Sequence, residues 1–175
     1  LRGQLGTDAL MPDVWPEGST FVLLDERVAQ TSLLPSERRV ARHFRIGPAS
    51  RGYDDPSYEY LVEAFDGNGL RPYAPVHVSV QAASNEDTFS WIRRTRIEGD
   101  DWAGLDVPLG EENESYLIRV RANGALVREE IVPEPSWAYT AAAKSADGLT
   151  GGYAVEIAQI SAIYGAGPAA RIQVA

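Results

Sequence analysis

The chain has 175 residues, and its 44% of apolar and 23% of charged residues are the proportions of a folded globular protein, not of a disordered one. Its net charge of −9 argues against binding to nucleic acid or to an anionic membrane surface. The chain has no cysteine and no uninterrupted apolar run of about 18 residues, so we expect no disulfide, no thiolate metal site and no membrane insertion.

The first 72 residues predict a small β-rich domain. Short alternations of apolar and polar residues predict strands at Thr20 to Leu24, Arg39 to Ile46 and Tyr58 to Phe65. The two prolines in the segment from Arg71 to Pro75 disfavour both helix and central strand, so this segment predicts an extended linker. We therefore place the domain boundary at this linker. Residues 1–72 either fold alone or complete a domain that lies upstream.

The start of the chain and its basic residues point to its origin. The chain begins at Leu1 with neither an initiator methionine nor a signal segment, so we expect a piece of a longer polypeptide. Fifteen of its sixteen basic residues are arginine. Such a bias is typical of a GC-rich genome and favours a bacterial source.

Residues 75–175 predict a β-sandwich, and the fold class that we expect for the whole chain is all-β. The Asn123-Gly124 pair is a hairpin signal, because both residues tolerate the positive φ of a type I′ turn. Seven short strands separated by turns are typical of two packed sheets. The expected strands are Val76 to Val80, Thr88 to Arg94, Ser115 to Arg121, Leu126 to Val132, Trp137 to Thr140, Tyr153 to Ile157 and Ala169 to Val174.

The order of landmarks in this second segment resembles the fibronectin type III fold. Trp91 lies on the second expected strand, Tyr153 opens the sixth, and a Gly-x-Gly-Pro turn from Gly165 to Pro168 precedes the last. The alternation places Trp91 in the centre of the core, between the two sheets. It also places Trp137 and Tyr139 on one inward face of the fifth strand.

Three patterns that carry chemistry in other proteins are weak here. Gly165 to Ala170 matches a loose dinucleotide fingerprint, but no helix can follow it to face a pyrophosphate, so it predicts a turn. Adjacent acidic pairs predict solvated loop acids, with a weak calcium site and a catalytic pair as open alternatives. The two histidines, His43 and His77, are too few ligands for a zinc site. We therefore expect no catalytic residue, cofactor or metal, and no enzymatic activity.

The acidic segment from Glu98 to Glu114 is the candidate partner-binding loop. It holds seven acids, no basic residue and one tryptophan, and it is longer than a hairpin turn needs. Its acids would steer a basic partner, and its tryptophan would be buried on binding. The open alternative is that the loop only packs over the edge of the sandwich. The candidate contact residues are Asp100, Asp101, Trp102, Glu111 and Glu112.

Three arginines, Arg93, Arg94 and Arg96, come just before this loop. We expect the nearby acids, Glu98 first among them, to neutralise these arginines on a solvated surface. A protein-contact patch is the open alternative for the three arginines.

Several segments of the chain together carry a resemblance to a known family. They are Leu1 to Thr7, Phe21 to Asp25, Gly69 to Val78, Trp91 to Arg96, Gly99 to Trp102, Val107 to Glu112, Ala158 to Ser161 and Gly165 to Pro168. These segments look like the C-terminal region of the large baseplate protein of gene transfer agents and related phage tails. The resemblance implies a structural subunit at the tail tip that holds fibres or host-recognition proteins, with no catalytic residues in this region.

The resemblance also implies a location and partners. It places the protein at the tail tip of a virion-like particle that assembles in the bacterial cytoplasm, among other baseplate proteins and fibres. There the parent protein forms an oligomeric ring, whereas the isolated fragment, with its charge of −9, is expected to be monomeric. The alternative function is a carbohydrate-binding or accessory module of a secreted enzyme. That function needs two or three coplanar exposed aromatic residues, and only Trp102 is a candidate.

Overall fold

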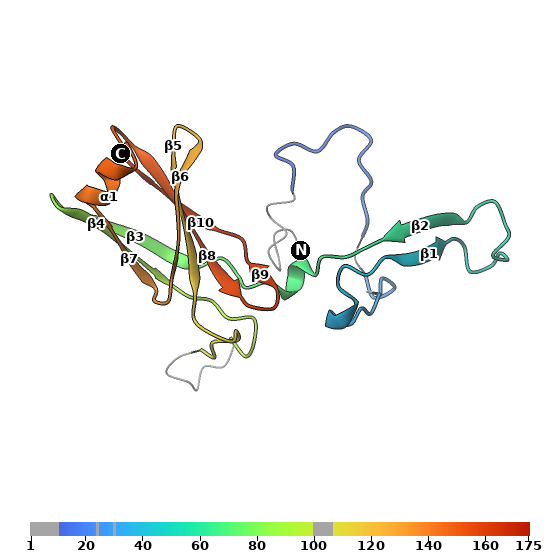
Figure 1. Cartoon of the computed structure of the whole chain (residues 1–175). Coiled ribbons are helices and arrows are strands. Elements are labelled where there is room, and N and C mark those ends of the chain that lie inside the picture. Colours follow the sequence, from blue (N-terminus) through green and yellow to red (C-terminus); the bar gives the residue numbers. More distant parts are fainter. Residues whose placement is uncertain (1–10, 24, 30, 100–106) are drawn as a thin grey trace. The chain divides into compact units, whose positions relative to one another are not determined.

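The computed structural model describes residues 11–23, 25–29, 31–99 and 107–175 (Figure 1). The chain divides into two compact units, and the division falls between Leu70 and Arg71. The first unit is called the N-terminal unit and the second the sandwich. Each unit is described by itself.

The N-terminal unit contains one antiparallel hairpin. Strand β1 (Arg42–Ile46) pairs with strand β2 (Glu59–Glu63), so that Phe44 lies opposite Leu61. Both strands lie within the ranges that the sequence predicts. The predicted strand at Thr20 to Leu24 is wrong for residues 20–23, which form no strand, and Leu24 lies outside the described residues. The composition of this apolar run favours a strand. However, in the described part of the unit β1 and β2 pair only with each other, so this run has no strand partner.

The N-terminal unit has no buried core among its described residues. None of the residues from 11 to 70 that the structure describes is buried. Trp15 remains 55% exposed and Tyr60 remains 63% exposed. A sheet of two strands offers no second layer against which these apolar side chains could pack.

The second unit is a sandwich of two antiparallel sheets (Figure 1). One sheet has the order β3-β4-β7 and the other the order β10-β8-β5-β6, with the short strand β9 paired to β8. The all-β, fibronectin type III-like sandwich predicted for residues 75–175 is thereby confirmed, because the first, second and fifth strands of the unit share one sheet. The strands are β3 (Val76–Ala82), β4 (Glu86–Ile92), β5 (Tyr116–Ala122), β6 (Ala125–Val132), β7 (Ser136–Thr140), β8 (Tyr153–Ser161), β9 (Gly165–Ala166) and β10 (Ala170–Val174).

The core lies between the two sheets and is rich in aromatic residues. Trp91 of β4 is 4% exposed, and its ring meets the Tyr116 ring of β5 edge to face, with 5.1 Å between centroids. Such edge-to-face contacts add to the free energy gained from apolar burial. The predicted central position of Trp91 is confirmed, as is the inward position of Trp137 and Tyr139. The buried core residues are Phe89, Trp91, Tyr116, Ile118, Val120, Val132, Trp137, Tyr139, Tyr153, Val155 and Ile157.

Local signals place the turns of the sandwich. Asn123 and Gly124 have φ values of 50° and 81°, so the predicted hairpin between β5 and β6 is confirmed. Helix α1 (Ala141–Ala146) follows β7 directly. The Thr140 hydroxyl caps it by accepting a hydrogen bond from the Ala143 N–H at 3.2 Å.

The segment from Arg71 to Pro75 is packed into the sandwich, which corrects the prediction of an extended linker. Pro72 and Pro75 are both buried. A Cβ atom at Gly167 would lie 2.1 Å from the Pro72 carbonyl oxygen, so the two backbones approach each other closely at this point. The predicted turn from Gly165 to Pro168 therefore also closes over this segment, and it includes the short strand β9 that the sequence did not predict.

Candidate functional site

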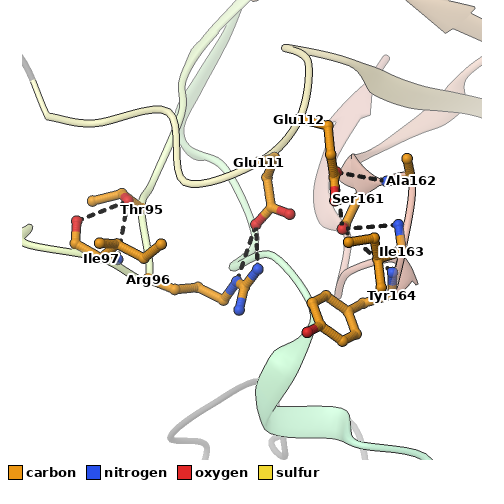
Figure 2. A network of polar contacts seen from close by, with 9 residues as sticks. All are labelled: Thr95, Arg96, Ile97, Glu111, Glu112, Ser161, Ala162, Ile163 and Tyr164. Atoms are coloured by element: carbon orange, nitrogen blue, oxygen red, sulfur yellow. Dashed lines mark hydrogen bonds and ion pairs between the residues drawn. The ribbon is translucent and has the colours of Figure 1, made fainter. Parts of the chain in front are cut away.

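An ion pair fixes the base of the acidic loop. The Arg96 guanidinium donates from Nε and Nη2 to Glu111 Oε1, at 3.0 and 2.9 Å (Figure 2). The side chains of Arg96 and Glu111 are only 15% and 3% exposed, so solvent screens this pair much less than a surface pair. The guanidinium also lies over the Tyr164 ring, 5.3 Å from its centroid. Residues from both ends of the loop are thereby joined to each other and to the turn after β8.

A second set of contacts closes the same base next to the ion pair. Arg93 donates to the carbonyl oxygens of Val107 and Pro108, at 2.8 and 3.0 Å. The Thr95 hydroxyl accepts from the Ile97 N–H at 3.1 Å, which turns the chain as it leaves β4. Backbone carbonyls are thus held at one end of the loop by a guanidinium at the other end.

Glu112 ties the loop to the β8–β9 turn. Its carboxylate accepts from the Ala162 N–H at 3.1 Å and from the Ser161 hydroxyl at 3.4 Å (Figure 2). Its own backbone N–H and that of Ala162 hold the pKa of this carboxyl below its usual value, although partial burial opposes them. The Glu112 carboxylate is therefore ionised at neutral pH, as a charge-assisted hydrogen bond requires. We call Arg93, Thr95, Arg96, Glu111, Glu112 and Ser161 the loop anchor.

The predicted contact residues do not share one environment. Asp100, Asp101 and Trp102 lie outside the described residues. Glu111 is not an exposed contact, which corrects the prediction for this residue: its carboxylate is buried and bound to Arg96. Glu112 is an exposed residue, but its carboxylate already accepts two hydrogen bonds within the chain.

The three arginines also have partners other than those expected. Arg93 binds carbonyl oxygens, Arg96 binds Glu111, and the Arg94 guanidinium lies 4.9 Å from the centroid of the Tyr73 ring. The partners of the three arginines lie at least 14 residues away in the sequence, so the proximity of Glu98 gave the wrong expectation.

A polar cluster joins helix α1 to both sheets of the sandwich. Lys144 Nζ lies 2.6 Å from Asp87 Oδ2, and the same carboxylate accepts a hydrogen bond from the Tyr153 hydroxyl. The Tyr139 hydroxyl donates to Asp147 Oδ2 at 2.5 Å. We call Asp87, Tyr139, Lys144, Asp147 and Tyr153 the tyrosine cluster. Asp87, Lys144 and Tyr153 border a shallow depression that is also lined by Leu149, Val174 and the neighbouring glycines.

The electrostatics of this cluster favour a structural role. Burial, and then the hydrogen bonds to carboxylates, raise the pKa of both Tyr139 and Tyr153 far above the value of a free phenol. Burial alone would raise the pKa of Asp87, but the hydrogen bonds from Lys144 and Tyr153 outweigh it and lower the pKa. At neutral pH the tyrosines are thus protonated donors and Asp87 is an ionised acceptor. Hydrogen bonds and one ion pair hold these groups to one another.

Within the described ranges, no group of three or more His, Asp or Glu side chains is placed to hold a metal ion. Among the same residues, no helix is both long and apolar enough to cross a bilayer.

Comparison with known proteins gives the fold alone. No protein-family model and no curated protein matches the chain. Among solved structures, domains d3–d4 of the rat CD45 extracellular region are similar at 9% identity and a TM-score of 0.45, over 94% of this chain and 79% of that one. A structure titled FN3tt mut is similar at 11% identity and a TM-score of 0.40, over 59% of this chain and 93% of that one.

A third similar structure contains the FN1–FN3 domains of chicken CNTN1. It has 22% identity and a TM-score of 0.40, and the match covers 67% of this chain and 35% of that one. Because all three TM-scores are below 0.5, the strand order described above is what establishes the fold. The second unit is a β-sandwich module of the fibronectin type III kind.

Proposed function

We propose that the chain is a structural tail-tip component of a phage-like particle of the gene transfer agent type, and that its sandwich presents an attachment loop for fibres or host-recognition proteins. The observation that carries the proposal is the loop anchor. Arg96 and Glu111, from the two ends of the loop, form a nearly buried ion pair, and Glu112 fastens the same base to Ala162. Because the base of the loop is fixed before binding, less conformational entropy of the loop is lost when a partner binds. Such a loop on a rigid scaffold is suited to attachment.

The residues of the anchor coincide with the segments that carry the sequence resemblance. Arg93, Arg96, Glu111, Glu112 and Ser161 all belong to those segments, although they are scattered between positions 93 and 161. Among them, Arg96 binds Glu111, and the Ser161 hydroxyl donates to the neighbouring Glu112 (Figure 2). A shared loop base explains why these separate segments resemble a single family, and this supports the tail-tip assignment.

The remaining features of the proposal come from the sequence resemblance and from the charge of the chain. The protein works inside an oligomeric ring at the tail tip, in a particle assembled in the bacterial cytoplasm, and it catalyses no reaction there. Its partners are other baseplate proteins and fibres. An acidic chain of charge −9 suits basic protein partners and not nucleic acid or membrane.

The test uses the particle that contains the full-length parent protein. Trp102→Ala, and separately Asp100→Asn with Asp101→Asn, change the loop without touching the anchor. We expect intact particles that have lost most of their fibres in electron micrographs. Ile131→Ala on β6 is the matched control, because Ile131 is 64% exposed on the same sandwich.

Two results would overturn the proposal. Normal fibres on both loop variants would remove the attachment role from this loop. If the wild-type chain were found as a module of a secreted enzyme and were absent from particles, the tail-tip assignment itself would be wrong.

The carbohydrate-binding alternative lacks a supporting observation in the described part of the sandwich. The large apolar side chains exposed between residues 71 and 99 and between 107 and 175 are all aliphatic. A sugar platform needs flat aromatic faces, so the described surface does not favour it. Glycan binding that survives Trp102→Ala would restore this alternative.

A further inference from the structure

The open edge of strand β2 in the N-terminal unit is the feature that carries a further inference. Among the described residues, the sheet of this unit contains only β1 and β2, so β2 has a strand neighbour on one side only. All five residues of β2 are exposed. An edge strand with accessible backbone is a template on which an extended segment of another protein can add as a further strand.

The side chains of β2 present a charge pattern on one face. Glu59, Leu61 and Glu63 alternate and therefore share a face, with an apolar residue between two acids. Leu61 is 40% exposed. Among the described residues, neither Glu59 nor Glu63 has an ion-pair partner in the structure, whereas Arg42 on β1 is paired with Glu37. On this face of the hairpin, Glu59 and Glu63 are the charged residues without an ion-pair partner among the described residues, whereas Arg45 of β1 lies on the face of Tyr60.

The opposite face of β2 is already used within the hairpin. The Tyr60 ring stacks on the His43 ring with 5.8 Å between centroids, and the two side chains also share a hydrogen bond. The side chains of an added strand would therefore find unpaired charges on the face that carries Glu59 and Glu63.

The same pattern opposes the pairing of β2 with β2 of a second copy of this chain. If β2 of one copy paired in antiparallel register with β2 of another, centred on Leu61, then Glu59 would lie opposite Glu63 at both ends. Like charges directly opposite each other destabilise a strand pair. In parallel register each glutamate would face its own counterpart, with the same result.

We propose that β2 is a docking edge for an extended protein segment that has basic residues at positions i and i+4 around an apolar residue. Such a segment continues the sheet through its backbone and places its two basic side chains opposite Glu59 and Glu63. Its central apolar side chain covers Leu61. The inference stands on the N-terminal unit alone and does not depend on the tail-tip proposal.

The competing explanation is that Glu59 and Glu63 only guard the edge against aggregation, as charges on edge strands often do. The two explanations differ in what they predict for a basic peptide. If the acids only prevent aggregation, β2 should bind no added strand in preference to another. If β2 is a docking edge, it should bind a strand of complementary charge at a defined position.

The experiment uses the full chain and the peptide Thr-Arg-Val-Leu-Val-Arg-Thr, with Thr-Glu-Val-Leu-Val-Glu-Thr as the charge-reversed probe. Fluorescence anisotropy measures binding, and hydrogen exchange with mass spectrometry locates it. We expect the basic peptide to bind and to slow exchange at residues 58–64. Glu59→Gln with Glu63→Gln should weaken binding by about tenfold, and Glu59→Arg with Glu63→Arg should transfer the preference to the acidic peptide.

The matched control is Glu17→Gln with Glu26→Gln, which removes the same charge from exposed acids outside the hairpin. It should leave binding of the basic peptide within about twofold at constant ionic strength. Hydrogen exchange at residues 42–46 and 59–63 without peptide reports whether each variant keeps the β1–β2 hairpin. The inference is overturned if the basic peptide does not bind, if both peptides bind alike, or if protection appears outside residues 58–64.

Discussion

The sandwich and the N-terminal unit treat their aromatic residues in opposite ways. In the sandwich, Trp91 is 4% exposed and Tyr139 is fully buried. In the N-terminal unit, Trp15 is 55% exposed, Phe21 is 85% exposed and Tyr60 is 63% exposed. The two units therefore differ less in the kind of residue they contain than in whether a second layer exists to cover those residues.

The difference comes from topology. The sandwich places two sheets face to face, so that Trp91 of β4 meets Tyr116 of β5 and Asp87 of β4 meets Tyr153 of β8. The N-terminal unit has one hairpin, and a hairpin alone is of marginal stability in water. We infer that the sandwich supplies nearly all of the free energy of unfolding of this chain.

Trp91→Ala tests this difference with the largest expected effect. Emptying an enclosed aromatic site costs about 3–5 kcal/mol in the free energy of unfolding, because the cavity cannot collapse fully. Trp91 also loses its edge-to-face contact with Tyr116. Chemical denaturation followed by circular dichroism measures the change.

Trp15→Ala is the matched control in the N-terminal unit. Because Trp15 is 55% exposed, we expect its removal to change the free energy of unfolding by less than about 0.5 kcal/mol. Equal losses in the two variants would contradict the proposed division of stability between the units.

Gly167→Ala tests the packing of the segment that enters the sandwich. Its Cβ atom would lie 2.1 Å from the Pro72 carbonyl oxygen, so one backbone must move. We expect a loss of about 1–3 kcal/mol, as for overpacking of a tight site. Gly52→Ala in the N-terminal unit is the control, because its Cβ atom would meet nothing within 4 Å. If Gly167→Ala melts like the wild type, Pro72 does not pack as described.

Asp87→Asn tests the tyrosine cluster through its dependence on pH. The folded-state pKa of Asp87 is lowered, so its contribution to stability is complete above the unfolded pKa of about 4 and is lost as pH falls through the lower folded value. At pH 7 we expect Asp87→Asn to cost about 1–3 kcal/mol, since Lys144 and Tyr153 lose a charged acceptor. The gap between wild type and variant should narrow below pH 4.

Denaturation at a series of pH values measures this gap. Asp66→Asn is the control in the N-terminal unit, where the Asp66–Arg39 pair is largely exposed and should contribute little at any pH. A gap that stays constant from pH 7 to pH 2 would show that the charge of Asp87 does not stabilise the cluster.

The sequence predicts the sandwich well because its signals are local. Alternation fixes the inward faces of β4 and β5, and Asn123-Gly124 fixes the hairpin that follows β5. Strand β9 was missed because its two residues, Gly165 and Ala166, are too few to show any alternation. The strand expected at Thr20 to Leu24 was wrong for residues 20–23, although their composition favours a strand. Composition alone does not show whether a second strand lies in place to pair with the segment.

The loop anchor could be predicted only in part. The sequence shows an acidic segment after a run of arginines, but not that Arg96 reaches Glu111 fifteen residues later. Such a pair depends on where the loop returns to the sheet, which is a property of the tertiary fold. Nearness in the sequence favoured Glu98 and led to the wrong partner.

Leu61→Ser has the smallest expected effect on the free energy of unfolding, and it compares an exposed leucine of the N-terminal unit with a buried leucine of the sandwich. Leu61 lies on β2 and is 40% exposed, whereas Leu117 lies on β5 and is 9% exposed. We expect Leu61→Ser to change the free energy of unfolding by less than about 0.5 kcal/mol, because little apolar surface returns to water. Leu117→Ser, with the same chemical change, should cost several times more. Comparable losses at the two positions would mean that the hairpin is part of the cooperative core, and the docking edge proposed for β2 would then lose the exposed leucine on which it depends.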